Sequence, residues 1–237
     1  MYKYTLLLAL VITTIFTKCD SLQKIADIAG KTVGLTNEEA GNGIKEALGN
    51  GLVRAVLNLN KEDGFMGSSF YKVLLPPDAQ KVENTMRTMG LGKLVDRAVL
   101  SINRGAEDAV GFAKPIFVNA IKQMTLVDAL NIVRGPKDAA TTYFKEKTTA
   151  ALLQAFTPVI QSSLDKVNAT KYYGDVITSY NKFPTTRNKI NPDLTSFVAG
   201  KATDALFDQI AKEETNIREN PVARTSDLLK KVFGQKW

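Results

Sequence analysis

The run from Asn191 to Phe233 carries the clearest helix signals in this 237-residue chain, so the other elements must pack against what it forms. Asn191 suits an N-cap, Pro192 the first helical position, and Asp193 the positive end of the helix dipole. Apolar residues then recur at steps of three and four until Pro221, which predicts one long helix with a buried face. They are Leu194, Phe197, Val198, Ala202, Ala205, Leu206 and Ile210.

Two pairs of opposite charge are expected on the solvent side of this long helix. Asp208 precedes Lys212 by four residues, and Glu214 precedes Arg218 by the same step, so each pair shares one helix face. A cleft with two catalytic carboxylates would be the alternative use of Glu213 and Glu214. The pattern favours a solvated face with ion pairs.

A short helix from Ser226 to Phe233 should follow Pro221. It carries four large apolar side chains, at Leu228, Leu229, Val232 and Phe233. Because about two helical turns are not stable alone in water, we expect this helix to dock on the domain and clasp it. The alternative is a mobile tail whose apolar face recruits a partner.

The first helix of the domain is predicted from a capping box, Thr36 to Glu39, through about Asn58. Its apolar face consists of Ile44, Leu48, Leu52, Val53, Val56 and Leu57. Glycines at 41, 43, 49 and 51 weaken this helix, which indicates either close helix packing or a mobile segment. The residues near 68–77 read as one extended segment, and since they have no partner strand we expect them to lie over helices.

Further helices are predicted at about 78–89, 91–121, 125–133, 138–167 and 172–183. Pro115 should kink or divide the second of these, and Thr125 with Asp128 should cap the third. No repeat and no linker between two cores is visible. The sequence therefore predicts an all-α, single-domain multi-helix bundle over residues 36–234.

Residues 1–18 have the features of a signal peptide, with a basic start and an apolar run too short to span a bilayer. Cys19 follows directly and is the only cysteine, at the position where bacterial lipoproteins carry their lipid. Phe16 and Lys18 depart from the small residues usual before such a cysteine. An uncleaved anchor and an ordinary signal peptide remain alternatives to lipidation. Residues 19–35 would form a tether.

Composition excludes several kinds of chemistry. The chain has no histidine, and its single cysteine lies at the end of the leader, which removes Ser-His and Cys-His nucleophiles and Cys/His zinc sites. We predict no cofactor and no metal. Of 31 basic residues, Lys3 and Lys18 belong to the leader, and the other 29 are interleaved with 24 acidic residues, so nucleic acid is not an expected partner.

Two groups of residues are candidates for a site. Gly135 and Pro136 place a helix N-terminus beside Arg134, which could hold a carboxylate or phosphate. The candidate ligand contacts there are Arg134, Gly135, Asp138, Tyr143 and Lys147; the alternative is a tight interhelical turn. The second group is Asn103, Arg104 and Glu107, which could form a buried polar cluster or an exposed stripe.

Four separated blocks resemble the domain of unknown function 4197 family of bacterial envelope proteins. They are LTNEEAGNGIKEAL, LPPDAQKVENTMRTMGLGKLVD, RGPKDAATTYFKEKT and the C-terminal run beginning NPDLTSFVAG. The resemblance covers nearly the whole chain after the leader. It implies a helical, signal-bearing protein, often with a lipoprotein-type cysteine, and brings no activity or catalytic residue with it.

These observations favour an exported, lipid-anchored envelope protein that acts as a non-enzymatic binding or scaffold module, with the membrane and an envelope protein as partners. A carrier of an apolar or anionic small molecule is the alternative, and an enzyme is the third class. A contiguous exposed apolar groove would indicate the first, an apolar pocket of several hundred Å³ the second, and convergent carboxylates in a cleft the third.

Overall fold

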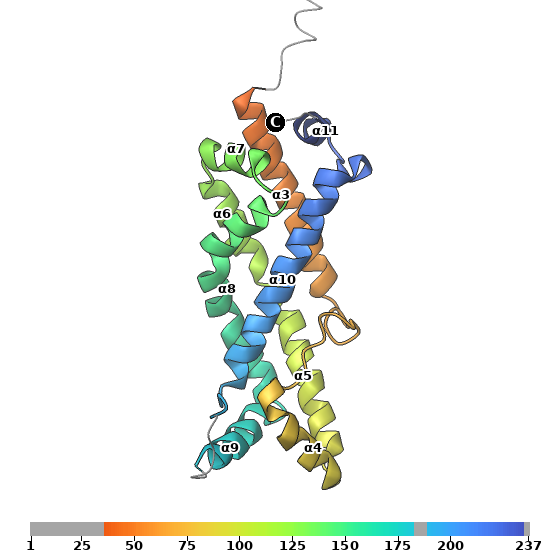
Figure 1. Ribbon diagram of the computed structural model, residues 1–237, viewed down its shortest axis with the longest axis vertical. Helices are drawn as coiled ribbons and strands as arrows, with labels where there is room; N and C mark the ends of the chain where they lie inside the picture. Colours follow the sequence, from red (N-terminus) through yellow and green to blue (C-terminus); the bar gives the residue numbers. More distant parts are fainter. Residues whose placement is uncertain (1–35, 183–188, 235–237) are drawn as a thin grey trace, which may run out of the picture.

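The computed structural model describes residues 36–182 and 189–234 of the chain. The predicted signal peptide, Cys19 and the tether lie outside the described residues. Within the described part the chain is helical and contains no strand, so the predicted all-α multi-helix bundle is confirmed (Figure 1). The elements are α3 (Asn37–Leu59), η2 (Pro77–Ala79), α4 (Gln80–Thr88), α5 (Gly92–Val110), α6 (Ala113–Gln123), α7 (Leu126–Arg134), α8 (Ala139–Asp165), α9 (Ala169–Asn181), α10 (Leu194–Glu219), η3 (Pro221–Ala223) and α11 (Asp227–Phe233).

The long helix α10 runs along the middle of an elongated bundle and packs against α3, α5 and α8 (Figure 1). At one end α3 begins, with α7 and α11 beside it. At the other end α4 and α9 splay from α5 and α8. At this end α4 packs on α5, and α9 packs on α8 and α10.

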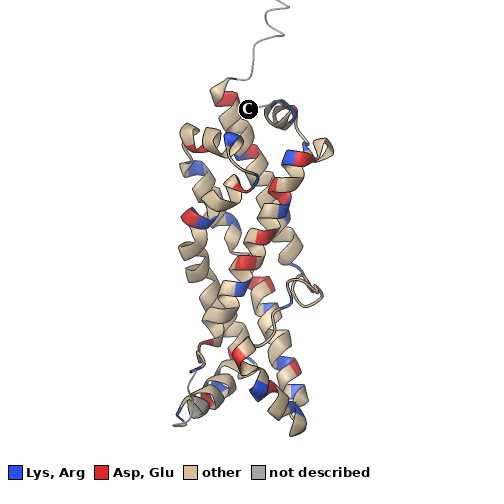
Figure 2. Cartoon of the chain, viewed as in Figure 1, with Lys and Arg blue, Asp and Glu red and all other residues tan. Residues whose placement is uncertain are grey.

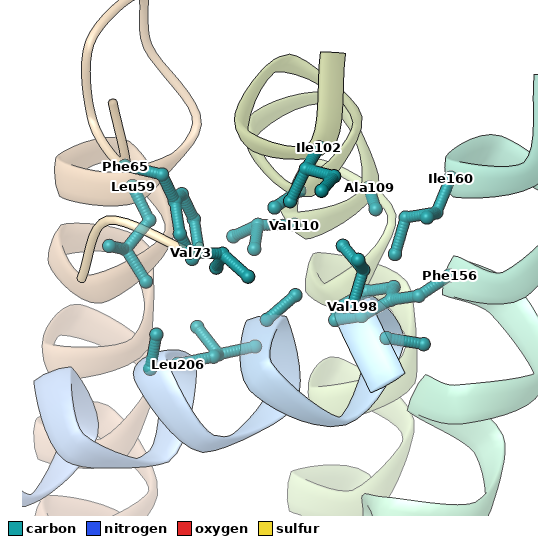
Figure 3. Packing of buried hydrophobic residues seen from close by; sticks show 14 of the residues in the cluster. Leu59, Phe65, Val73, Ile102, Ala109, Val110, Phe156, Ile160, Val198 and Leu206 are labelled. Carbon is teal, nitrogen blue, oxygen red and sulfur yellow. The ribbon is translucent and has the colours of Figure 1, made fainter. Parts of the chain in front are cut away.

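Apolar side chains from α3, α5, α8 and α10 meet in the core (Figure 3). The segment between α3 and α4 contributes side chains to this core as well. The labelled members include Phe65, Val73, Ile102, Val110, Phe156, Ile160, Val198 and Leu206.

The start of α10 differs from the prediction. The helix begins at Leu194, and its N-cap is Asp193, whose carboxylate accepts a hydrogen bond from the Ser196 N–H at 2.9 Å. Asn191 instead accepts from the Asp193 N–H at 3.0 Å and forms a turn before the helix. The Asp193 carboxylate, two residues after Asn191, competes for the free N–H groups at the start of the helix. The N-cap is therefore Asp193 and not Asn191.

Both predicted capping boxes are present. The Thr36 hydroxyl accepts from the Glu39 N–H, and the Glu39 carboxylate accepts from the Thr36 N–H. Thr125 and Asp128 exchange the same pair of bonds at the start of α7. Since each box satisfies N–H groups within one turn, these two helix starts depend only on local sequence.

Two of the four glycines of α3, Gly41 and Gly43, allow close helix packing. A Cβ at Gly41 would lie 2.7 Å from Leu126 Cδ1, and one at Gly43 would lie 2.6 Å from Val232 Cγ2. The predicted apolar face is wrong at Val53 and Leu57, which are exposed. Ile44, Leu52 and Val56 of the predicted face are buried, together with Leu59 and the small residues of α3.

The segment predicted as extended at 68–77 is only partly so. Residues 69–71 form a turn and η2 begins at Pro77, while residues 72–74 lie between them without helix or turn. Val73 there is held on α5 by Asn103 and pairs with no strand, as predicted. The long pattern after this segment divides into α5 and α6 at Gly111 and Phe112, so Pro115 stands in the first turn of α6, where a missing N–H has little cost. α8 continues through Pro158.

In the described residues, no helix taken singly has both the length and the apolar character to cross a membrane. One pair, Gly92–Gln123 with Leu126–Arg134, meets those criteria together, across a bend of 102°.

Candidate functional site

The buried carboxylate of Glu214, on α10, lies at the first turn of α8. Its Oε1 accepts from the Ala140 N–H at 3.0 Å, and its Oε2 accepts from the N–H and the hydroxyl of Thr141 at 2.9 and 2.8 Å. The first N–H groups of a helix have no intrahelical acceptor, and an anion there is favoured by the helix dipole. The anion at this helix N-terminus is therefore a side chain of the chain itself.

Arg218 completes this arrangement, which we call the Glu214 cluster: Glu214, Arg218, Ala140 and Thr141. The guanidinium donates to Glu214 Oε1 at 2.9 and 3.1 Å and to the Ile132 carbonyl, at the end of α7, at 2.8 Å. The side chains of Glu214 and Arg218 are only 5% and 14% exposed. The expected solvent-side position of this pair is wrong, because the α7–α8 turn covers this part of α10.

Glu213 faces a different neighbour from Glu214. It pairs with Arg54 of α3 at 3.5 Å. The two adjacent carboxylates thus point to different helices, and they do not face one cleft.

Of the five predicted contacts near Arg134, two line a common groove. Tyr143 and Lys147 line an open groove of about 530 Å³ between α6, α7 and α8, with Lys147 Nζ 5.9 Å from the centre of the Tyr143 ring. Arg134, Gly135 and Asp138 are not among the residues that line it. Gly135 lies in a tight turn, where a Cβ would be 2.7 Å from the Asn131 carbonyl oxygen, in agreement with the interhelical-turn alternative.

Asn103 is buried and fastens the extended segment to α5. Its side-chain oxygen accepts from the Val73 N–H at 2.8 Å, and its amide nitrogen donates to the Val73 carbonyl at 2.8 Å and to the Val99 carbonyl at 2.7 Å. One side chain thus supplies the two hydrogen bonds that a partner strand would have given Val73.

Glu107 is also buried and holds the turn that follows α3. Its Oε1 accepts from the N–H groups of Phe65 and Met66 at 3.0 and 3.1 Å, and its Oε2 accepts from Arg104 at 2.6 Å. Arg104 also contacts Asp63 at 2.9 Å. The exposed-stripe alternative is therefore wrong for Asn103 and Glu107, and all three residues fasten the segment between α3 and α4.

A third polar group, which the sequence did not indicate, joins this segment to α10. The Tyr71 hydroxyl donates to Asp208 at 2.6 Å and lies 2.7 Å from Lys212 Nζ. Burial and the hydrogen bond to Asp208 raise the pKa of Tyr71 above its ordinary value. The predicted Asp208–Lys212 pair is present at 2.8 Å. The sequence showed the four-residue spacing of Asp208 and Lys212. It did not show their contact with Tyr71, which lies more than a hundred residues away in the chain.

An apolar pocket of about 380 Å³ opens between α4, α5 and α9, and we call it the α9 pocket. Its half-buried wall includes Val82, Met86, Ala98 and Val167. Burial and the charge of Asp78 raise the pKa of Tyr173, on its floor, to about 12, so this phenol stays neutral. The buried floor consists of Leu75, Ala79, Val95, Ala169, Tyr173 and Leu194.

The mouth of the α9 pocket combines exposed apolar and basic side chains. Leu94 and Tyr172 are 41% and 52% exposed there, and Arg97 and Lys166 lie beside them. Figure 2 shows basic segments on α4, at the start of α5 and on α9, at the end of the bundle where this pocket opens. The sequence alone does not indicate this site, because its lining residues come from elements far apart in the chain.

Among the described residues, no group of three or more acidic or cysteine side chains is arranged to hold a metal ion. The buried carboxylates of Glu107 and Glu214 and the half-buried carboxylate of Asp208 each bond to backbone N–H, hydroxyl or basic groups of the fold.

Comparison with known proteins gives a family and no activity. No curated protein and no solved structure showed a significant match. The model of one family, described as protein of unknown function (DUF4197), matches residues 34–234, which include every element described above. The chain belongs to the DUF4197 family.

Proposed function

We propose that this protein is exported, is held on a bacterial membrane by lipid at Cys19, and acts there as a non-enzymatic binding module through the α9 pocket. The observation that carries the binding role is the pocket itself, with its apolar floor, its volume of about 380 Å³ and its open mouth. Ligand sites typically have about 300 to 1,000 Å³ and mostly apolar walls with a few polar groups. The α9 pocket has these properties.

The use of the buried acidic groups supports a non-enzymatic role. Glu107 and Glu214 accept hydrogen bonds from backbone N–H groups of neighbouring segments and pair with Arg104 and Arg218. A general acid or base must be within reach of a substrate proton. These carboxylates are instead committed to holding the fold together.

A carrier of an apolar or anionic small molecule is the second candidate, and the same pocket favours it. The two proposals differ in the occupant, which is a segment of an envelope partner in one and a free small molecule in the other. Native mass spectrometry of protein purified from its own envelope separates them. A small-molecule adduct that Leu94→Asp removes would favour the carrier.

The neutral fluorophore N-phenyl-1-naphthylamine tests the pocket. We expect it to bind the purified full chain saturably at one site. Ala98→Phe, which fills the pocket, and Leu94→Asp, which places a charge at its mouth, should each weaken binding at least about tenfold. Ala150→Phe, at an exposed position of α8, is the matched control for folding and for added aromatic surface. Equal binding by all four proteins would refute the pocket as the site.

The anchor needs a separate test. Metabolic labelling with an alkyne fatty acid should mark the wild-type chain and leave Cys19→Ser unmarked. Stable anchoring requires more than one acyl chain, and in this proposal all of them are attached through Cys19. The Cys19→Ser variant has no such chains, so it should also leave the membrane fraction. Labelling of both proteins to the same extent would refute lipidation at this residue.

A further inference from the structure

We propose that the α9 pocket takes a single-chain anionic amphiphile, with the apolar chain inside the pocket and the anionic head between Arg97 and Lys166. This inference rests on the α9 pocket being a binding site, as proposed above. It develops the second candidate, the small-molecule carrier, by adding the chemical class of the ligand. It follows from three features: the lining, the two cations at the mouth, and the volume.

The lining selects an apolar chain. The floor is buried and apolar, and the half-buried wall is formed by Val82, Met86, Ala98 and Val167. Burying apolar ligand surface against these side chains contributes about 25 cal/mol per Å². The one polar side chain of the floor, Tyr173, lies with its hydroxyl 3.3 Å from the Asn191 carbonyl, so it is already engaged.

The mouth selects an anionic head. Arg97 projects from α5 and Lys166 from the α8–α9 turn, and both line the pocket and are exposed. Neither side chain has an ion pair or hydrogen bond to another described residue. Every other arginine in the described ranges has a partner, such as Glu213 for Arg54. Arg97 is therefore the exception among them, and it stands at the entrance of the apolar pocket.

The acidic groups nearest in sequence do not neutralise these cations directly. Asp96 pairs with Arg87 at 2.9 Å. Asp165 accepts from Gln161 at 2.7 Å and from Thr170 at 3.1 Å. A carboxylate, sulfate or phosphate head would thus form ion pairs with Arg97 and Lys166, whose side chains have no partner within the described residues 36–182 and 189–234.

The volume limits the ligand to one chain. At about 380 Å³ the pocket lies near the lower end of the usual range for ligand sites. The second chain of a diacyl lipid would have to remain outside, against the exposed mouth. We therefore commit to a single-chain ligand.

Calorimetric titration of the full chain tests this inference with three ligands of equal chain length: decanoate, 1-decanol and decyltrimethylammonium. We expect decanoate to bind at least about tenfold more tightly than the other two, and increasing salt to weaken only decanoate. The double variant Arg97→Ala, Lys166→Ala should lower decanoate affinity about tenfold and leave 1-decanol within twofold. The double variant Lys114→Ala, Lys122→Ala, at exposed lysines of α6, is the matched control.

The outcomes separate the two proposals. If decanoate and 1-decanol bind equally and Ala98→Phe blocks both, the pocket stands and the anionic head is wrong. If Ala98→Phe leaves decanoate binding unchanged, the ligand lies elsewhere and both proposals are wrong. No binding of any of the three ligands overturns this inference, while N-phenyl-1-naphthylamine still reports separately on the pocket.

Discussion

Glu214 and Arg218 form a buried ion pair one helical turn apart on α10, and together they join three helix ends. Glu214 binds the first N–H groups of α8, and Arg218 binds the last carbonyls of α7. Arg218 also lies 6.0 Å from the centre of the Phe233 ring of α11. The pair thus fixes the α7–α8 turn and touches the C-terminal helix.

Removing one member of this pair should be strongly destabilising. Glu214→Ala leaves Arg218 and two helix N–H groups buried without their acceptor, and breaking a buried pair typically costs about 3 to 5 kcal/mol. Urea unfolding followed by circular dichroism measures this loss. Glu219→Ala, on the same helix but exposed, should change the free energy of unfolding by less than about 1 kcal/mol. Similar losses for both variants would contradict the structural role of Glu214.

Asn103→Ala should loosen the segment between α3 and α4 before it affects the rest of the bundle. The variant leaves the buried N–H and carbonyl of Val73 without partners, at a cost of about 1 to 3 kcal/mol for each group. Hydrogen exchange should therefore speed up at residues 68–76. Asn119→Ala, at an exposed position of α6, is the control, and unchanged exchange at 68–76 in Asn103→Ala would count against this function of the side chain.

The capping box of α7 should make stability depend on pH. Hydrogen bonds from the hydroxyl and the N–H of Thr125 lower the pKa of Asp128 below its ordinary 3.8. An acidic group whose pKa is lower in the folded than in the unfolded protein stabilises the fold when the pH is above its unfolded-state pKa. This stabilisation is lost as the pH falls through the folded-state pKa. The melting temperature difference between wild type and Asp128→Ala should thus be largest near neutral pH and shrink below about pH 4. The same comparison in a Thr125→Ala background should show less dependence on pH.

What the sequence predicted well depends on residues close together in the chain. Thr36 with Glu39 and Thr125 with Asp128 lie three residues apart, so the backbone geometry of one helical turn brings them together. The Glu214 cluster joins residues 73 and 74 positions apart, and the spacing of Glu214 and Arg218 said only that they share a helix face. Which neighbours cover that face is a property of the packed bundle.

The α9 pocket illustrates the same limit. Leu75, Val95, Tyr173 and Leu194 each fit an ordinary apolar helix or extended pattern, and nothing in the sequence indicates that they surround a shared space. The sequence shows that Arg97 lies next to apolar residues of one helix, but only the placement of α4 and α9 shows that it stands at a pocket. Packing determines such a site, and local propensity does not.

Docking of α11 should contribute substantially to stability, as the sequence predicted. Val232 is buried with residues of α3 and α7, and Leu229 is buried with Ala47 of α3 and Ile217 of α10. Leu228 and Phe233 pack beside them. Ending the chain after Thr225 removes residues 226–237, which include α11. It keeps Arg224, whose guanidinium donates to the Ile217 and Arg218 carbonyls. Burial of each large apolar side chain is worth about 1.5 to 3 kcal/mol before the ordering entropy is subtracted, so this truncation should lower the melting temperature. A melting temperature within about 2 °C of the full chain would support the mobile-tail alternative.

Two glycines of α3 should respond in opposite ways to alanine, although both lie inside the same helix. At Gly49 an added Cβ meets nothing within 4 Å, so Gly49→Ala should stabilise the protein by up to about 1 kcal/mol through helix propensity alone. At Gly43 the Cβ would lie 2.6 Å from Val232 Cγ2 and 3.1 Å from Leu228 Cγ, so α11 must move and Gly43→Ala should destabilise. Val232→Ala removes the clashing methyl group. Gly43→Ala should therefore cost less in a Val232→Ala background, and equal costs in both backgrounds, measured by urea unfolding, would show that Gly43 is not needed for the contact with α11.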